Sequence, residues 1–235
     1  MMKCPVCSKE NDDFATTCIR CSSFLQNRIP NLDFFETAWK ILESPQKTFR
    51  RIVVAEHKNY SFFLFALFGI SLSFSAFWYF RLGNRFDTLL DLIPWAVLVG
   101  VCLGVATALV LTALYHGVAK LLGGNSSLRN SFAILAYSLV PIVGSLVLVL
   151  PIELLTFGMY LFTSNPHPYT IKPLSYVLLM GFDGAVAAWS ILLVTIGTIV
   201  GHQLSLVRSI VTVSVTLALF GGVFFLAAGA LQVGG

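Results

Sequence analysis

Five long apolar runs occupy the chain after residue 60, and most charged residues lie outside them. Each run holds about twenty residues or more, enough for an α-helix rising ~1.5 Å per residue to cross ~30 Å of hydrocarbon. We place these spans at about 61–80, 92–120, 137–162, 174–201 and 208–232. The pattern predicts an all-α polytopic membrane protein with a five-helix transmembrane bundle.

The stretch 131–162 lies at the centre of this arrangement, with two apolar runs on each side. A straight helix of this length would measure ~48 Å, which exceeds the hydrocarbon thickness. Pro141 and Pro151 each remove a helix hydrogen bond and should bend it. We expect residues 131–140 to form a lead-in near the membrane surface and residues 141–162 to form the span. The alternative is a re-entrant pair of helices broken at Pro151.

Charged residues divide the chain into a polar head and a membrane domain. Hydrophobic residues make up 57% of the chain and charged residues 11%, against about 25% charged in soluble domains. Residues 1–60 hold nine of the fifteen Lys and Arg and seven of the eleven Asp and Glu. The net charge of +4 is best interpreted through where the charged residues lie, and not as a sign of nucleic-acid binding. We therefore expect no nucleic-acid partner.

The head opens with four cysteines in the pattern C-x2-C-x10-C-x2-C, namely Cys4, Cys7, Cys18 and Cys21. Two C-x2-C turns can direct four thiolates at one point and complete a tetrahedral zinc site. Because protein atoms supply all four ligands, the Zn²⁺ would be structural and would replace a hydrophobic core. We assign residues 1–26 to a zinc ribbon. The alternative is a pair of disulfides, which requires an oxidising compartment.

This opening resembles the short zinc ribbons at the N-termini of many prokaryotic membrane proteins. It departs from them at Ser8 and Ser22, where a glycine often follows the second cysteine of each knuckle. Serine retains the ligands but adds backbone strain there. The fifth cysteine, Cys102, lies in an apolar run, and we expect it to be a small packing residue.

Residues 27–60 are predicted to form a linker and two amphipathic juxtamembrane helices. Asp33 and Glu36 fit a capping box, and Ser44-Pro45 is typical of a second helix start. The apolar positions are Phe34, Phe35, Ala38, Trp39 and Leu42 in the first helix and Phe49, Ile52 and Val53 in the second. Such helices either lie in the headgroup plane or pack on the cytoplasmic face of the membrane domain.

Small residues recur at four-residue spacing in two of the spans. They are Ala96, Gly100, Gly104 and Ala108 in the second span and Gly197 and Gly201 in the fourth. Such faces allow helix backbones to approach closely, so we expect them to be packing surfaces. His116 and His202 lie near the ends of the same two spans, and we expect them to be interfacial residues rather than ligands or proton carriers.

Basic residues near the spans predict the orientation of the chain. With five spans and the head inside, the inner side carries Lys47, Arg50, Arg51, Lys58, Lys120, Arg129 and Arg208. The outer side carries Arg81, Arg85 and Lys172. Seven against three favours a cytoplasmic N-terminus, and thiolate ligands agree with a reducing compartment.

Several short sequence features follow one another in a characteristic order along residues 33–232. They are Ser44-Pro45 with Phe49 before the first span, Gly123-Gly124 before the third, and Ala136-Tyr137 ahead of Pro141. With five closely set spans, this region resembles the Yip family, the Ypt-interacting membrane proteins. Eukaryotic members are associated with Rab-type GTPases and early secretory vesicles. The zinc ribbon indicates the prokaryotic type, so the resemblance implies a role in membrane organisation or trafficking in a prokaryotic cytoplasmic membrane, without Rab binding.

Two classes of function fit these features. The first is a non-enzymatic membrane scaffold or adaptor whose cytoplasmic ribbon recruits a protein partner. The second is a small transporter, channel or lipid-handling protein. An intramembrane enzyme is a third alternative, but the chain lacks H-E-x-x-H, G-x-S-x-G and P-loop motifs, and we assign no catalytic residue.

The second class depends on Glu153 and Asp183, a candidate intramembrane polar site. Glu153 lies nine residues before Phe162 and Asp183 nine after Leu174, so both should lie ~13 Å below the outer boundary on antiparallel helices. Neither span contains Lys or Arg to offset a buried charge. We expect both to face the bundle interior, either as separately hydrogen-bonded acids or as a shared proton or cation site.

Overall fold

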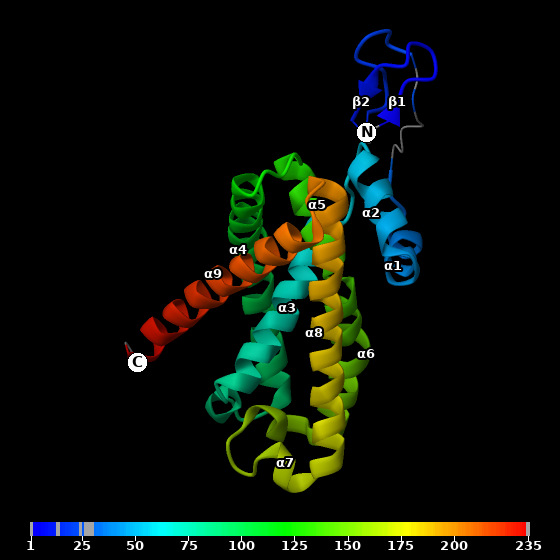
Figure 1. The fold of residues 1–235 in the computed structure, drawn as a ribbon. Coiled ribbons are helices and arrows are strands. Elements are labelled where there is room, and N and C mark those ends of the chain that lie inside the picture. The colour runs from blue at the N-terminus through cyan, green and yellow to red at the C-terminus, as the bar shows by residue number, and fades with distance from the viewer. Residues whose placement is uncertain (1, 13–14, 24, 26–30, 234–235) are drawn as a thin grey trace.

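The computed structural model of the chain describes residues 2–12, 15–23, 25 and 31–233, with side chains described as far as residue 223. A small two-stranded head lies at one end of an elongated helical bundle (Figure 1). In the head, β1 (Met2–Lys3) and β2 (Glu10–Asn11) are antiparallel, with Met2 opposite Asn11. Two short helices, α1 (Phe34–Glu43) and α2 (Pro45–Val54), follow beside the bundle.

The bundle consists of long helices joined by short connections. In chain order its elements are α3 (Ser61–Tyr79), the 3-10 helix η1 (Leu82–Arg85), α4 (Leu89–Leu121), α5 (Leu128–Ser138), α6 (Val140–Phe157), the 3-10 helix η2 (Gly158–Phe162), α7 (Pro168–Ile171), α8 (Pro173–His202) and α9 (Leu206–Val233). Within the described residues, five segments are long and apolar enough to cross a membrane: α3, α4, residues 128–162, α8 and α9. The predicted all-α fold with five membrane-spanning segments is therefore confirmed.

The central stretch is divided at one residue. Helix α5 ends at Ser138 and α6 begins at Val140, directly before Pro141. Pro141 has no N–H to donate to the preceding turn, so the helical hydrogen-bond ladder is interrupted there and the break falls at Leu139. Helix α6 then continues through Pro151 to Phe157. The chain therefore bends at Pro141, and Pro151 does not reverse its direction.

Glycines bring α3 and α4 into backbone contact. A Cβ atom on Gly104 would lie 2.5 Å from the carbonyl oxygen of Phe65, and one on Gly69 would lie 2.2 Å from the carbonyl oxygen of Gly100. Neither contact has room for a methyl group, because the opposing atoms belong to the backbone of the partner helix. The small-residue face predicted for the second span is thus the surface on which α3 packs.

Two further glycines receive side chains from other elements. A Cβ on Gly197 would lie 2.5 Å from Cγ2 of Ile134 and 3.1 Å from the ring of Phe49. A Cβ on Gly201 would lie 2.2 Å from Cδ1 of Ile134. The α8 glycines therefore form the recess into which α5 and α2 pack. Phe49, with Ile134, is fully buried there.

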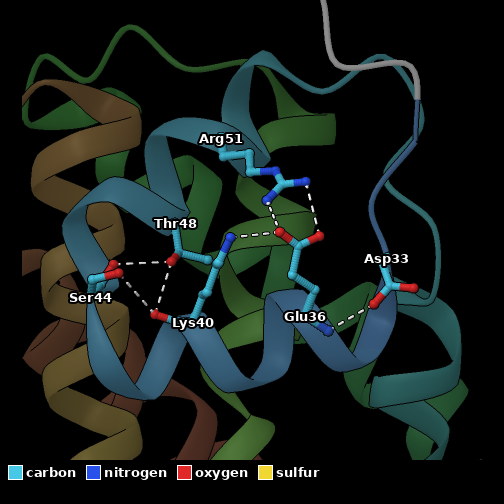
Figure 2. Close-up of polar contacts among 6 residues, drawn as sticks. All are labelled: Asp33, Glu36, Lys40, Ser44, Thr48 and Arg51. Atoms are coloured by element: carbon cyan, nitrogen blue, oxygen red, sulfur yellow. Dashed lines mark hydrogen bonds and ion pairs between the residues drawn. The ribbon is translucent and has the colours of Figure 1, made fainter.

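Polar contacts fix the angle between α1 and α2 (Figure 2). Asp33 caps α1 as predicted, since its Oδ1 accepts the N–H of Glu36 at 2.7 Å. The Glu36 carboxylate does not complete the capping box. It accepts Lys40 Nζ at 2.6 Å and the two terminal nitrogens of Arg51 at 2.7 and 3.2 Å. These charges lower the pKa of Glu36 to about 2, first through the Arg51 hydrogen bond and then through Lys40.

The two helices bury different parts of their apolar surfaces. On α2, Phe49 and Ile52 are fully buried against the membrane domain, as the packed alternative requires. On α1, Ile41 is fully buried, whereas Phe35 and Trp39 are 80% and 71% exposed. The apolar stripe of α1 is wider than its contact with the bundle, so one edge faces the core and the other remains uncovered.

Lys58 closes the C-terminal end of α2. Its Nζ donates to the carbonyl oxygens of Ile52, Val53 and Ala55 at 2.7, 3.1 and 3.0 Å. Burial, together with the nearby charge of Arg129, lowers the pKa of Lys58 to about 8. Lys58, which the sequence places among the basic residues that flank the membrane, therefore also stabilises the last turn of α2.

Cys102 does not pack in the interior, contrary to the expectation from sequence. Its side chain is exposed on α4. In a membrane helix the lipid-facing surface is as apolar as the interior, so an apolar neighbourhood in sequence does not indicate burial.

Candidate metal centre and membrane polar sites

Two backbone turns of the same form carry the four cysteines of the head. In the first turn the N–H of Ser8 donates to the carbonyl of Cys4 at 2.9 Å. In the second turn the N–H of Ser22 donates to the carbonyl of Cys18, also at 2.9 Å. Each turn therefore directs its two cysteine side chains to the same side.

The backbone of each turn reverses through a left-handed residue. Ser8 has a φ of 57° and Ser22 a φ of 54°. These are the two positions at which the sequence departs from the glycine of similar ribbons. The left-handed region is unfavourable for a residue with a Cβ atom, so both serines are held there by the surrounding turn.

The four sulfur atoms form one cluster. The Sγ atoms of Cys4, Cys7, Cys18 and Cys21 all lie within 4.8 Å of one another, and all four are free cysteines. Cys4 and Cys21 are separated by 3.6 Å and Cys7 and Cys18 by 3.5 Å. Ligands at a Zn–S distance of ~2.3 Å in a tetrahedron lie ~3.8 Å apart, so the cluster fits a tetrahedral metal site.

Electrostatics within the cluster also suit a bound cation. The Ser23 hydroxyl, 3.0 Å from Cys4 Sγ, lowers the pKa of Cys4 to about 6. Backbone N–H groups of Cys21 and Arg20 lower the pKa of Cys18. For Cys7, the hydrogen bond from the backbone N–H of Lys9 lowers the pKa of the thiol. Desolvation and the neighbouring thiols outweigh this effect and raise the pKa of Cys7 to about 12. Four thiolates this close require a positive charge between them.

The two intramembrane acids lie on one cavity. Glu153 on α6 and Asp183 on α8 both line a space of about 710 Å³ between α3, α6 and α8. Glu153 is only 4% exposed, and its Oε1 has no hydrogen-bond partner within the described part of the chain. Asp183 Oδ1 accepts a hydrogen bond from the hydroxyl of Ser145.

Ser145 did not emerge from the sequence as a site residue. It lies eight residues before Glu153, about two helical turns away, so both occupy the same face of α6. That spacing is the signal that could have identified it. Its contact with Asp183 on α8 could not be predicted in this way, because the register between two apolar helices is set by packing.

The two histidines form a buried polar bridge. Ser131 Oγ lies 2.8 Å from Nδ1 of His116 and 2.9 Å from Nε2 of His202. His202 is completely buried at the end of α8, so its ring is enclosed by protein there. Helix α5 covers this end of the bundle and brings Ser131 between α4 and α8. The bridge thereby ties three helices together.

The short features that carry the resemblance to the Yip family lie at the same end of the bundle as this bridge. Gly123 ends α4 with a φ of 91°, and a Cβ on Gly124 would lie 2.5 Å from Nδ1 of His202. Tyr137 is completely buried, and its hydroxyl donates to the carbonyl of Asn59 at 2.7 Å. Ser44 precedes Pro45 at the α1–α2 junction. These residues build helix ends and contacts, and none of them lines the acidic cavity.

Comparison with known proteins identifies one family. The family model described as the Yip1 domain matches residues 39–228, which is more than half of the chain. The match includes α2 and all five membrane-spanning segments but not the four-cysteine head. Neither the curated proteins nor the solved structures gave a match.

Proposed function

We infer a function for the chain from the premise that it belongs to the Yip1 domain family. We propose that it is a non-enzymatic integral membrane scaffold of a prokaryotic cytoplasmic membrane. Its four-cysteine head holds a structural Zn²⁺ on the cytoplasmic side and recruits a protein partner to the membrane. The role in membrane organisation or trafficking follows from the family, and the recruiting role follows from the head.

The observation that carries this proposal is the closed four-sulfur cluster. All four positions of a tetrahedral Zn²⁺ are supplied by the chain, so no position is left for water or substrate. The Zn²⁺ would supply folding free energy to the head and no catalysis. A head whose metal has no open coordination position is suited to binding a partner. The bound metal would hold the surface of the head in one rigid conformation.

Each cysteine turn presents one exposed aliphatic side chain. Val6 in the first turn is 73% exposed, and Ile19 in the second is 78% exposed. Exposed aliphatic side chains are available to a partner protein. Covering them stabilises the complex by ~25 cal/mol per Å² of apolar surface removed from water. We assign Val6 and Ile19 to the recruiting surface.

The experiment compares the full-length protein with V6S/I19S in the native membrane after cross-linking in the cell. Wild type should capture a discrete cytoplasmic protein, and V6S/I19S should capture at least about tenfold less, with unchanged zinc content. E10S, which alters an exposed polar residue on β2, is the matched control and should capture the wild-type amount. Equal capture by wild type and V6S/I19S, or no partner for wild type, would reject the recruiting role.

A further inference from the structure

The cavity that holds Glu153 and Asp183 has the size and lining of a ligand site. Its volume of about 710 Å³ lies within the range of small-molecule pockets. Apolar and aromatic side chains make up most of its wall, among them Phe68, Leu72 and Phe74 of α3 and Tyr176 of α8. The cavity is only partly enclosed, and three membrane-spanning helices form its sides, so a ligand can reach it from within the membrane.

Glu153 supplies an acceptor that the protein itself leaves unused. The residue lines the cavity although it is only 4% exposed, and its Oε1 is buried without a hydrogen-bond partner within the described residues. An unpaired buried carboxylate oxygen is costly, so a donor in the cavity would gain the full hydrogen bond. Asp183 is partly held by Ser145 and supplies a second carboxylate to the same space.

Among the described residues, no Lys, Arg or His forms an ion pair with either of these two acids. The segments 128–162 and 173–202 contain one basic side chain, Arg129, which donates to the carbonyl of Glu56 at the opposite end of the bundle. Since neither acid has an ion-pair partner in the described part of the chain, a ligand cation or protons can supply the compensating charge.

The cavity suits an organic cation better than a metal ion. Ca²⁺ requires six to eight oxygen ligands at ~2.3–2.6 Å, whereas here two carboxylates and a few hydroxyls lie on a large apolar wall. An ammonium group needs only a few acceptors and can also lie against aromatic rings. The apolar wall would cover a hydrocarbon body.

We propose that this cavity binds a hydrophobic amine, a ligand with one cationic N–H group and an apolar body, through Glu153 and Asp183. The ammonium group donates to Glu153 Oε1 and to Asp183, and the apolar body lies along α3 and α8. The site lies at the end of the bundle away from the head and is independent of protein recruitment by Val6 and Ile19.

The test uses the full-length protein in phosphatidylcholine nanodiscs and a twelve-carbon primary amine carrying a terminal diazirine. The twelve-carbon alcohol with the same diazirine is the neutral control. The amine should label peptides of α3, α6 and α8 at least tenfold more strongly than the alcohol, because a charge-assisted hydrogen bond contributes about 1.5–3 kcal/mol. E153Q/D183N should reduce amine labelling to the level of the alcohol.

D91N removes an acid near the start of α4 that does not line the cavity, so it should label like wild type. If E153Q/D183N does not fold, competition decides: unlabelled dodecylamine should displace the probe from wild type, and dodecanol should not. Equal labelling by amine and alcohol, labelling spread evenly over all five spans, or full labelling of a folded E153Q/D183N would each overturn the proposal.

Discussion

Ser8 and Ser22 each hold a backbone conformation that glycine adopts at lower cost. Left-handed backbone costs an L-residue about 1–2 kcal/mol, part of which is offset because glycine loses more entropy on folding. We therefore predict that S8G and S22G each stabilise the zinc-bound head by about 1 kcal/mol. Chelator competition on the full-length protein should show about fivefold tighter Zn²⁺ binding for each variant.

E10G is the control for this prediction, since Glu10 lies in β2 and has no left-handed backbone. Glycine weakens a strand, so E10G should bind Zn²⁺ no more tightly than wild type. Unchanged or weaker Zn²⁺ binding in both S8G and S22G would show that the turns do not strain these serines.

Residues differ in how far the sequence alone could place them. Cys4, Cys7, Cys18 and Cys21 were identifiable because their spacing is local, and the structure brings them together. The burial of His202 was not identifiable, because it depends on Ser131, 71 residues away in the chain. Local patterns report the neighbours of a residue along its own helix, whereas burial in a bundle depends on other helices.

At the scale of elements, the α3–α4 contact leaves no room for a single added methyl group. We predict that G104A destabilises the protein by about 2 kcal/mol or more, since its Cβ would lie 2.5 Å from the carbonyl of Phe65 and 2.8 Å from Cα of Ala66. Thermal unfolding in detergent micelles measures the effect.

Gly117 provides the matched control on the same helix, because a Cβ there meets nothing within 4 Å. G117A should be neutral or stabilise α4 by up to ~1 kcal/mol through its helix propensity. If G104A and G117A unfold at the same temperature, the close approach of α3 and α4 is wrong.

The α1–α2 hairpin should respond to acid through Glu36. Its folded pKa of about 2 lies below its ordinary value of 4.5, because the carboxylate is paired with Arg51 and Lys40. The pairing therefore stabilises the hairpin fully above pH ~4.5, and this contribution is lost as the pH falls through about 2. We predict faster hydrogen exchange in α1, relative to α3, over this interval.

E36Q isolates the contribution of this carboxylate, because glutamine keeps the shape and cannot ionise. At pH 7 its α1 amides should exchange faster than those of wild type, and the difference should vanish near pH 2. A wild-type to E36Q difference that persists unchanged at pH 2 would show that the ion pair does not hold the hairpin.

Elements were predictable where local chemistry decides them. Pro141 marks the break in the central stretch, and Asp33 and Pro45 mark the starts of α1 and α2. The packing of α2 was not decided by sequence, because the same apolar face fits lipid headgroups or a protein surface. Gly197 and Gly201, which receive Phe49 and Ile134, resolve the choice in favour of packing on α8.

At the scale of the whole molecule, the two candidate sites occupy opposite ends. The head lies beyond the end where α5 meets α8, and the acidic cavity lies toward η2 and α7 (Figure 1). A ligand in the cavity contacts α8, whose other end packs against α2 near the head. The five spans and the placement of the two acids away from the head were predictable from apolar length and position along the chain, whereas the cavity itself depends on how the helices pack.

The structure gathers basic residues at the end nearest the head. Arg129 donates a hydrogen bond to the carbonyl of Glu56, and the positive charge of Arg129 lowers the pKa of Lys58. Arg208 lies next to Gly123 at the end of α4. Arg81 contacts His167 at the opposite end of the bundle. Because cations near spans favour the cytoplasmic side, this clustering predicts a cytoplasmic head, and five spans then place the end of α9 outside.

Reporter fusions test this orientation step by step along the chain. Alkaline phosphatase, which is active only outside the cytoplasm, should be inactive when fused after Gly124, beyond two spans, and active after Ser164, beyond three. It should be active again after Val233, beyond five, while a fluorescent protein fused before Met1 should fluoresce in the cytoplasm. An inactive phosphatase after Val233 with an active one after Ser164 would mean that α9 does not cross, because the chain returns to the cytoplasm through α8. Activity after Gly124 would instead invert the whole molecule and expose the cysteines to an oxidising compartment, where the four-thiolate site could not persist.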